Sequence, residues 1–123
     1  MSETVLIDSN VFIRIHRGDI VLLESVERFQ HAAINTVVYF ELVCGEPSKQ
    51  RFESMEKRLA SYELVHLDPT ICAIAIDLVR RFKFSKGMDY PDAFIAATCI
   101  EKGFVLYTLN RRHFDFIPEL KVI

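Results

Sequence analysis

The chain has 123 residues, the usual size of one domain, and we expect a single domain over residues 1–123. Half of its residues are hydrophobic and 26% are charged, which is typical of a globular core and excludes a disordered or fibrous chain. The formal net charge of −2 excludes a global basic field, so a polyanionic partner would have to use local basic patches.

Three cysteines, Cys44, Cys72 and Cys99, lie far apart without CxxC spacing, which argues against a zinc site or a disulfide framework. We expect buried thiols in a reducing compartment. The first residues lack a basic segment followed by an apolar run, and no segment approaches the ~20 apolar residues of a membrane span. We therefore expect a cytoplasmic protein with no membrane contact.

The chain begins with a short apolar run at residues 4–7 that ends in Asp8, Ser9 and Asn10. This pattern predicts a buried strand followed by a helix that runs toward Gly18. A second helix is expected over residues 19–28, a second strand over 32–36 and a third helix from 37 to 44. The three polar residues are all good N-caps, so helix capping alone would explain them.

Glu41 is the most unusual residue of the third predicted helix, because its neighbours at helical spacing are apolar. A glutamate is almost never fully buried unless it is paired or coordinates a metal, since desolvation of its charge is costly. The alternatives are that its side chain reaches the edge of the helix or pairs with an arginine.

After a break at Pro47 and Ser48, a charged amphipathic helix is expected over residues 49–62. A strand at 64–68, a helix from Pro69 and a further helix that ends at Lys102 and Gly103 follow. A fourth strand at 104–108 and a short final strand at 119–123 complete the chain. Because short apolar strands alternate with helices, we predict an α/β fold with a parallel sheet covered on both faces.

Asp92 lies at the start of the last predicted helix, where a carboxylate meets the positive end of the helix dipole. Behind it, Ala93, Ala96, Ala97 and Ile100 share one face, which predicts a buried helix. For this segment alone, a core helix with a dipole-matching acid explains the residues as well as a functional site does.

In an open parallel sheet, ligands bind beyond the carboxyl ends of the strands, where the strand order reverses. Asp8 and Asn110 each follow a predicted strand and should lie at this edge. Glu41 lies about one turn into a helix that follows a strand and is within reach of it. The same rule does not place Asp92, because its helix leads into the fourth strand.

Four motifs of the chain together resemble those of the PIN-domain nucleases, most closely the VapC-like toxins of bacterial and archaeal toxin–antitoxin pairs. They are Val-Leu-Ile-Asp-Ser-Asn at residues 5–10, Asn-Thr-Val-Val-Tyr-Phe-Glu-Leu-Val-Cys-Gly at 35–45, Pro-Asp-Ala-Phe-Ile-Ala-Ala-Thr at 91–98 and Leu-Tyr-Thr-Leu-Asn at 106–110. The resemblance covers essentially the whole chain. It implies a three-layer α/β/α sandwich with a central, mainly parallel sheet of four to five strands.

The resemblance also implies a metal-dependent endoribonuclease in which Asp8, Glu41 and Asp92 converge on Mg²⁺ or Mn²⁺. It implies a homodimer that a small antitoxin protein holds inactive. The chemistry agrees, because hard divalent ions choose carboxylate oxygens, and clustered carboxylates repel one another without a cation. A bound ion can activate water and offset charge on an RNA phosphate.

Polar and basic residues near these acids are candidates for supporting roles. Asn10, Thr108 and Asn110 are interpreted as groups that orient the acids, water or phosphate, although turn and cap hydrogen bonds would also explain them. Candidates for an RNA-binding rim are Arg14, Arg111 and Arg112, with Arg17, Lys83 and Lys86, although each is also explained as an ordinary solvated charge.

One position departs from the family pattern. Family members often carry a fourth acid shortly after the Thr-x-Asn motif, and His113 stands there in this chain. Either His113 ligates the ion, which would favour Mn²⁺ over Mg²⁺, or Asp115 or Asp89 supplies the missing acid. Position alone does not choose among them.

Two other functions remain open at this point. The missing fourth acid makes a non-catalytic RNA- or protein-binding module on the same fold plausible. A phospho-acceptor signalling domain has the same length and sheet type, with Asp68 in the place of the acceptor. However, the chain lacks the acidic pair that such a domain carries after its first strand, and Glu41 would be unexplained.

Overall fold

The computed structural model describes residues 3–123, and its centre is a four-stranded parallel sheet. The strands lie in the order β3-β2-β1-β4. Val5 of β1 pairs with Ala32 on one side and with Val105 on the other. The strands are β1 (Val5–Ile7), β2 (Ala32–Asn35), β3 (Glu63–Val65) and β4 (Val105–Tyr107).

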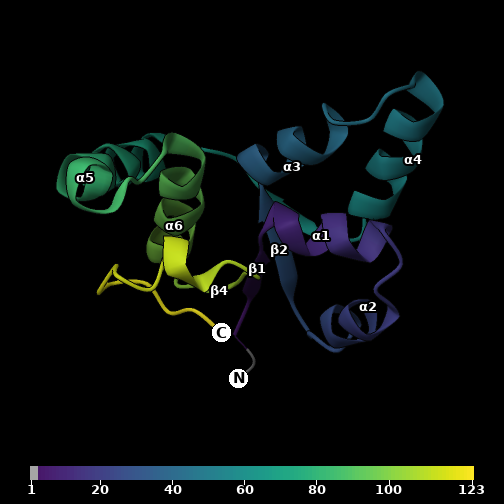
Figure 1. Ribbon diagram of the computed structural model, residues 1–123, viewed down its shortest axis with the longest axis horizontal. Coiled ribbons are helices and arrows are strands. Elements are labelled where there is room, and N and C mark those ends of the chain that lie inside the picture. The colour runs from purple at the N-terminus through teal and green to yellow at the C-terminus, as the bar shows by residue number, and fades with distance from the viewer. Residues whose placement is uncertain (1–2) are drawn as a thin grey trace.

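Helices cover both faces of the sheet, which confirms the predicted three-layer α/β/α sandwich (Figure 1). The α5 and α6 helices lie on one side, α1, α2 and α4 lie on the other, and α3 contacts α1, α4 and α6 at one end of the sheet. The helices are α1 (Ser9–His16), α2 (Ile20–Glu27), α3 (Thr36–Val43), α4 (Lys49–Leu59), α5 (Pro69–Lys86) and α6 (Tyr90–Lys102), followed by a 3-10 turn, η1 (Arg111–His113).

Short polar side chains begin the helices, as their positions in the sequence predict. Asp19 accepts a hydrogen bond from the backbone of Leu22, and Asp68 accepts one from Ile71. These bonds satisfy backbone donors that have no partner within a helix. No helix within residues 3–123 is both long enough and apolar enough to cross a membrane.

The direction of α6 follows from the short turn that joins it to β4. Gly103 ends α6 with a φ of 69°, a left-handed conformation that glycine adopts without strain, and β4 begins two residues later. A helix that packs on a sheet and turns this tightly into a strand runs antiparallel to that strand. The first turn of α6, with Asp92, therefore lies at the carboxyl edge of the parallel sheet.

The α6 helix is buried more widely than its predicted face. Ala93, Ala96 and Ala97 are buried as expected, whereas Ile100 is half-buried. Other residues around the helix are also buried, including Ile95, Thr98 and Cys99. The reason is that α6 contacts α3, α5 and β4 at once.

Two expectations are wrong in detail. The final strand is reduced to a single bridge between Leu106 and Val122, because residues 114–120 form turns and only the last three residues reach β4. Of the three thiols, Cys99 is buried, Cys72 is half-buried and Cys44 is exposed at the end of α3.

Candidate active site

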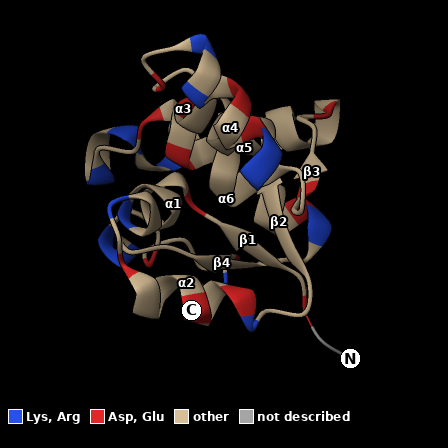
Figure 2. Cartoon of the chain, turned by 90° about the vertical axis from the view of Figure 1, so that its right-hand side faces the viewer, with Lys and Arg blue, Asp and Glu red and all other residues tan. Residues whose placement is uncertain are grey.

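The site lies at the point where the strand order reverses. From β1 the chain adds β2 and β3 on one side of the sheet and then returns to add β4 on the other. The carboxyl ends of β1 and β4 therefore bring residues 8 and 108 together. Figure 2 shows strands β1, β2 and β4 without charged residues, so the charges of this region belong to the segments that follow the strands and to the helices.

Asp8 is buried at this edge and its two carboxylate oxygens have separate partners. Its Oδ1 accepts a hydrogen bond from the backbone nitrogen of Ser9 at 2.8 Å, which caps α1. Its Oδ2 accepts the hydroxyl of Thr108 at 2.9 Å. The carboxylate is therefore held in one orientation from both β1 and β4.

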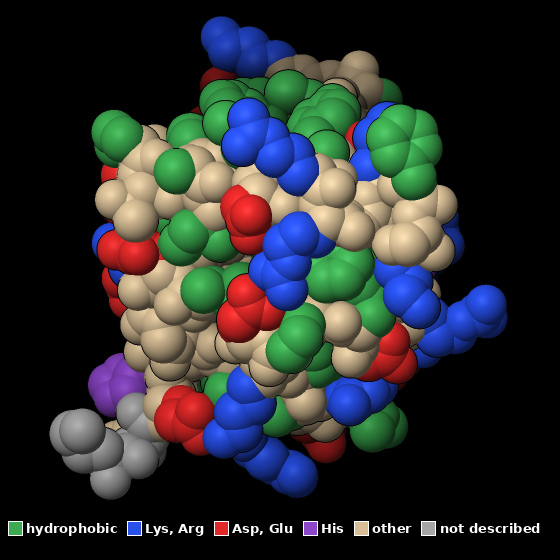
Figure 3. Space-filling view, turned by 90° about the vertical axis from the view of Figure 1, so that its left-hand side faces the viewer, with side chains coloured by type: hydrophobic (Ala, Val, Ile, Leu, Met, Phe, Trp, Pro, Cys, Tyr) green, Lys and Arg blue, Asp and Glu red, His purple; other side chains and the backbone are tan. Residues whose placement is uncertain are grey.

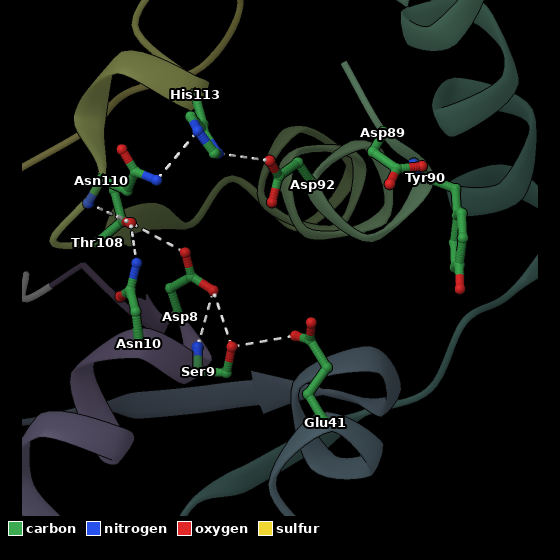
Figure 4. Close-up of polar contacts among 10 residues, drawn as sticks. All are labelled: Asp8, Ser9, Asn10, Glu41, Asp89, Tyr90, Asp92, Thr108, Asn110 and His113. Carbon is green, nitrogen blue, oxygen red and sulfur yellow. Dashed lines mark hydrogen bonds and ion pairs between the residues drawn. The ribbon is translucent and has the colours of Figure 1, made fainter. Parts of the chain in front are cut away.

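Ser9 links Asp8 to Glu41. The Ser9 hydroxyl donates to Glu41 Oε1 at 3.1 Å (Figure 4). The apolar neighbours of Glu41 suggested a buried carboxylate, but its side chain is exposed, because α3 lies at the open end of the sheet and Glu41 points toward Ser9. Ser9 was not among the predicted site residues; its place directly after Asp8 is the signal that identifies it.

Asp92 is half-buried in the first turn of α6 and is held by His113. His113 Nδ1 lies 3.0 Å from Asp92 Oδ2, and His113 Nε2 lies 3.1 Å from the side-chain nitrogen of Asn110. With the Asn110 amide as donor to Nε2, the imidazole hydrogen is carried by Nδ1 and is donated to Asp92. In this arrangement both ring nitrogens are engaged.

Asn10, Thr108 and Asn110 form a connected network beside Asp8. The Thr108 hydroxyl accepts hydrogen bonds from the Asn10 side chain at 3.2 Å and from the Asn110 backbone at 3.0 Å. Asn10 also accepts the backbone nitrogen of Leu109 at 3.3 Å. These two incoming bonds leave the Thr108 hydrogen for Asp8, so the network fixes the direction in which Thr108 donates.

The three acids influence one another electrostatically. Burial raises the pKa of the Asp8 carboxyl above its usual value, although the hydrogen bonds from Thr108 and Ser9 oppose this rise. Partial desolvation at the edge of the site is the main cause of the raised pKa of the half-buried Asp92 and of the more exposed Glu41. The charge of Asp8 raises the pKa of both further, which is the behaviour of carboxylates that share one site.

A buried amide connects the helices that carry two of these acids. The Asn35 side chain, fully buried at the end of β2, donates to the Thr98 hydroxyl in α6 at 3.0 Å and accepts the backbone nitrogen of Val38 in α3 at 3.0 Å. Glu41 and Asp92 lie on these same two helices. The amide therefore fixes how α3 stands relative to α6.

The remaining acidic candidates lie farther from Asp8. Asp89 caps α6 by accepting the backbone nitrogen of Tyr90 at 2.7 Å, and Figure 4 shows its carboxylate beyond Asp92. Asp115 is exposed after η1, and within residues 3–123 its side chain has no hydrogen bond or ion pair with the site.

Three surface clefts adjoin the site, two of them lined by one of its three acids. One of about 290 Å³ runs from Glu41 between α1, α3 and α4. A second of about 400 Å³ is lined by Asn10 and Asn110 together with Arg14, and a third of about 130 Å³ is lined by Asp92 and His113 together with Arg112. Of the other predicted basic contacts, Arg17 lines the first two clefts and Lys86 the third, whereas Lys83 and Arg111 are exposed on α5 and η1.

The donor set suits a hard divalent ion. Carboxylate oxygens are what Mg²⁺ and Mn²⁺ prefer, and the mutual repulsion of the three acids is what a cation would relieve. Within residues 3–123, no three His, Cys, Asp or Glu side chains stand close enough to hold one ion together. An ion such as Mg²⁺ often takes one or two carboxylates and keeps several waters, so it need not contact all three acids directly.

The chain matches the model of the PIN domain over residues 5–119. It belongs to the PIN-domain family. Ribonuclease VapC19 of Mycobacterium tuberculosis is 30% identical to this PIN domain over 121 residues, which cover 94% of the chain and 96% of that relative. Ribonuclease VapC1 of Methanocaldococcus jannaschii is 29% identical over 119 residues, with 94% and 82% covered.

Solved structures share the fold of this PIN domain. A toxin–antitoxin complex from Klebsiella pneumoniae contains a chain with a TM-score of 0.83 and 22% identity, which covers 97% of this chain and 95% of its own. A chain of VapBC2 from Rickettsia felis, bound to a promoter DNA fragment, has a TM-score of 0.81 and 21% identity, with 98% and 97% covered. The family predicted from the four motifs is confirmed.

Proposed function

We propose that this PIN domain is an Mg²⁺- or Mn²⁺-dependent endoribonuclease that hydrolyses phosphodiester bonds of RNA. The observation that carries the proposal is the convergence of Asp8, Glu41 and Asp92 from three different elements on the edge where the strand order reverses. The names of the VapC relatives support RNA as the substrate class.

Asp8, Glu41 and Asp92 are the residues that would surround the ion, one or two of them in direct contact and the rest through the waters that the ion keeps. When bound, such an ion offsets the negative charge of the scissile phosphate and makes an attacking water a better nucleophile. Thr108 and Ser9 orient Asp8 through opposite oxygens, and Ser9 also holds Glu41. The protein thus restricts the rotamers of two acids before any substrate arrives.

His113 has a different proposed task. It holds Asp92 through Nδ1, and Asn110 holds His113 through Nε2, so the imidazole is a positioning group and not a ligand. The Oδ1 atom of Asp92 accepts no hydrogen bond from any of the described residues. Arg14 and Arg112, in the clefts on either side, are the groups that would bind RNA phosphates near the acids.

The biological role that fits best is the toxin of a toxin–antitoxin pair, acting on RNA in the cytoplasm and restrained by a small antitoxin protein. The similarity to VapC ribonucleases and to chains of toxin–antitoxin complexes supports it. A homodimer is the proposed assembly. Exposed apolar side chains on α3, α5 and α6, Phe40, Ile76 and Tyr90, are the candidates for its interface.

The test is cleavage of structured RNAs by the purified protein in Mg²⁺ or Mn²⁺, compared with Asp92→Asn and Glu41→Gln. We expect both variants to lose cleavage, and EDTA to abolish it. Glu53→Gln, an exposed acid on α4, is the matched control and should cleave normally. Equal cleavage by the parent and Asp92→Asn would point to a contaminating nuclease, and RNA binding without cleavage would identify a binding module.

A further inference from the structure

The cleft beside Asp92 leads away from the acids toward the end of α5. It is lined by Asp89, Asp92 and His113 together with Lys86, Arg112 and Phe116. An RNA strand with its scissile phosphate at the acids would meet two cations and an aromatic ring in this direction. Those are the groups that bind the backbone and bases of single-stranded nucleic acid.

Phe84, in the last turn of α5, is almost completely exposed at 94%. Burial of a phenylalanine is worth about 1.5–3 kcal/mol, so a ring left in water gains nothing from the fold of its own chain. The Lys83 ammonium lies 5.6 Å from the centre of this ring. A cation beside an open aromatic face matches a platform on which a base can stack.

A second aromatic ring, that of Phe116, lines the cleft. Phe116 packs edge-on against Phe82 with ring centres 4.9 Å apart, and the Lys86 ammonium lies 5.8 Å from the Phe116 ring. The Phe82 contact ties the C-terminal segment to α5. Lys86 lies four residues after Phe82 and shares its side of α5. Phe84 projects from another side of the same helix end, so a strand that leaves the cleft would reach it by passing over the C-terminal end of α5.

The basic residues here differ in whether they are already neutralised. Arg81 forms ion pairs with Asp77 and Glu119 and is not available to a phosphate. Within residues 3–123, Lys86 and Arg112 have no ion pair with an acidic residue. Figure 3 looks onto this side of the molecule, where basic side chains lie among hydrophobic and acidic ones.

We propose that the end of α5 is a binding surface for the single-stranded RNA that flanks the scissile phosphate, with Lys86 and Arg112 on the backbone and Phe84 stacked on a base. The proposal rests on the proposed ribonuclease function. RNA fits this surface better than a second copy of the chain does, because Lys86 and Arg112 have no ion pair among the described residues and match the charge of an RNA backbone.

The experiment measures RNA affinity without cleavage. The Asp8→Asn protein serves as the background, and a labelled single-stranded oligoribonucleotide of about ten nucleotides is the probe. Phe84→Ala should weaken binding by roughly 5- to 100-fold, the equivalent of one lost base stack. Lys86→Ala should lower the salt dependence of log K by about 0.7, the value for one phosphate contact on a single strand.

Matched variants separate this surface from general effects. Val21→Ala removes another exposed apolar side chain, and Lys57→Ala another exposed cation, and both should bind like the background protein. Phe84→Trp should retain affinity. The sequence has no tryptophan, so this variant also gives a single fluorophore whose emission should be quenched when RNA binds.

Each outcome has a distinct meaning. Undiminished RNA affinity in Phe84→Ala, or an unquenched Phe84→Trp, would overturn the surface while leaving the ribonuclease proposal intact. A Phe84→Ala protein that binds RNA normally but loses self-association in sedimentation would reassign Phe84 to a contact between copies. Absence of RNA binding by the Asp8→Asn protein itself would count against the ribonuclease proposal as a whole.

Discussion

Asp8 combines two roles that, from the sequence, look like alternatives. One oxygen caps α1 through the backbone of Ser9, and the other accepts the hydroxyl of Thr108. A capping carboxylate normally reaches solvent, but this one is 6% exposed and close enough to Asp92 and Glu41 to raise their pKa values. The fold therefore buries a charge that it does not neutralise, which is costly unless a cation arrives.

That cost predicts how stability depends on pH. The pKa of Asp92 is raised above 3.8 in the folded protein, first by burial and then by Asp8. A raised folded-state pKa contributes stability that is present below pH 3.8 and is lost as the pH rises through the folded-state value. As the pH rises from the usual pKa of an aspartate through the folded-state pKa of Asp92, the free energy of unfolding of Asp92→Asn in EDTA should therefore fall less than that of the parent. Urea unfolding measures this difference.

Two comparisons complete this prediction. Mg²⁺ or Mn²⁺ should stabilise the parent at neutral pH and should stabilise Asp92→Asn much less, because an ion that binds only the folded state raises its stability. The same dependence of stability on pH in the parent and in Asp92→Asn, both in EDTA, would contradict the proposed burial of uncompensated charge, because every other carboxyl is common to the two proteins.

His113 is expected to affect both ions equally. In His113→Ala, Asp92 loses the donor at 3.0 Å, and we expect the affinities for Mg²⁺ and Mn²⁺ to fall by similar factors of about 10–100, measured by calorimetry without RNA. His113→Asn keeps a donor near Asp92 and should recover part of the loss. A loss confined to Mn²⁺ would instead make the imidazole a ligand. The nitrogen chemical shifts of His113 should report hydrogen on Nδ1.

Among the elements, the sequence places some site residues better than others. The rule for parallel sheets locates Asp8 and Asn110, because both follow strands. The rule does not by itself place Asp92. The turn after α6 does, because Lys102 and Gly103 lie directly before β4 and the helix therefore has to start at the carboxyl edge. The exposure of Glu41 was one of the alternatives that the sequence left open, and its apolar neighbours could not decide it, since the outcome depends on where α3 lies.

The link between α3 and α6 includes a buried hydroxyl beside a backbone carbonyl, because the Asn35 amide also donates to the Phe94 carbonyl at 3.3 Å. Thr98 accepts the Asn35 amide at 3.0 Å and donates to the Phe94 carbonyl at 2.8 Å. Thr98→Val should destabilise the protein by about 1–3 kcal/mol, because it leaves a buried amide with one partner fewer. Thr70→Val, at an exposed position of α5, is the matched control for urea unfolding. Equal stability of the two variants would show that the hydrogen bond between Asn35 and Thr98 does not stabilise the fold.

The turn after α6 gives a backbone prediction. Gly103 has a φ of 69° and open space around its α-carbon, so Gly103→Ala suffers from backbone strain and not from a clash. We expect a loss of about 1–2 kcal/mol in thermal unfolding. Gly103→Asn tolerates the left-handed conformation better and should lose less. If both variants are equally unstable, contacts and not backbone conformation are responsible.

At the scale of the whole molecule, the alternation of strands and helices was enough to predict the parallel sheet and its two covered faces. The contacts that complete the site were harder to predict, because they join distant residues through side chains. The path from Asn110 through His113 to Asp92 is one case, and the link from Ser9 to Glu41 is another. The final strand was overestimated because apolar composition does not reveal the turns before it.

The C-terminal residues cover the free edge of β4. Leu106 donates to Lys121 at 2.9 Å and accepts from Ile123 at 2.8 Å. Deletion of residues 121–123 should lower the unfolding free energy by about 1–3 kcal/mol, for two lost backbone hydrogen bonds. It should also promote concentration-dependent aggregation through the exposed edge, visible by light scattering. Lys121→Ala, which removes only the ion pair with Glu3, should do neither.

The pairing of β1 with β4 also determines when the site can exist during synthesis. β1 is the first strand to leave the ribosome and β4 is the last, and Asp8 meets Thr108 across a separation of 100 residues. A nascent chain can carry Asp8, Glu41 and Asp92 and still lack the strand that orients the first of them. For a protein proposed to cut RNA, activity then has to wait until Thr108 has emerged from the ribosome that makes it.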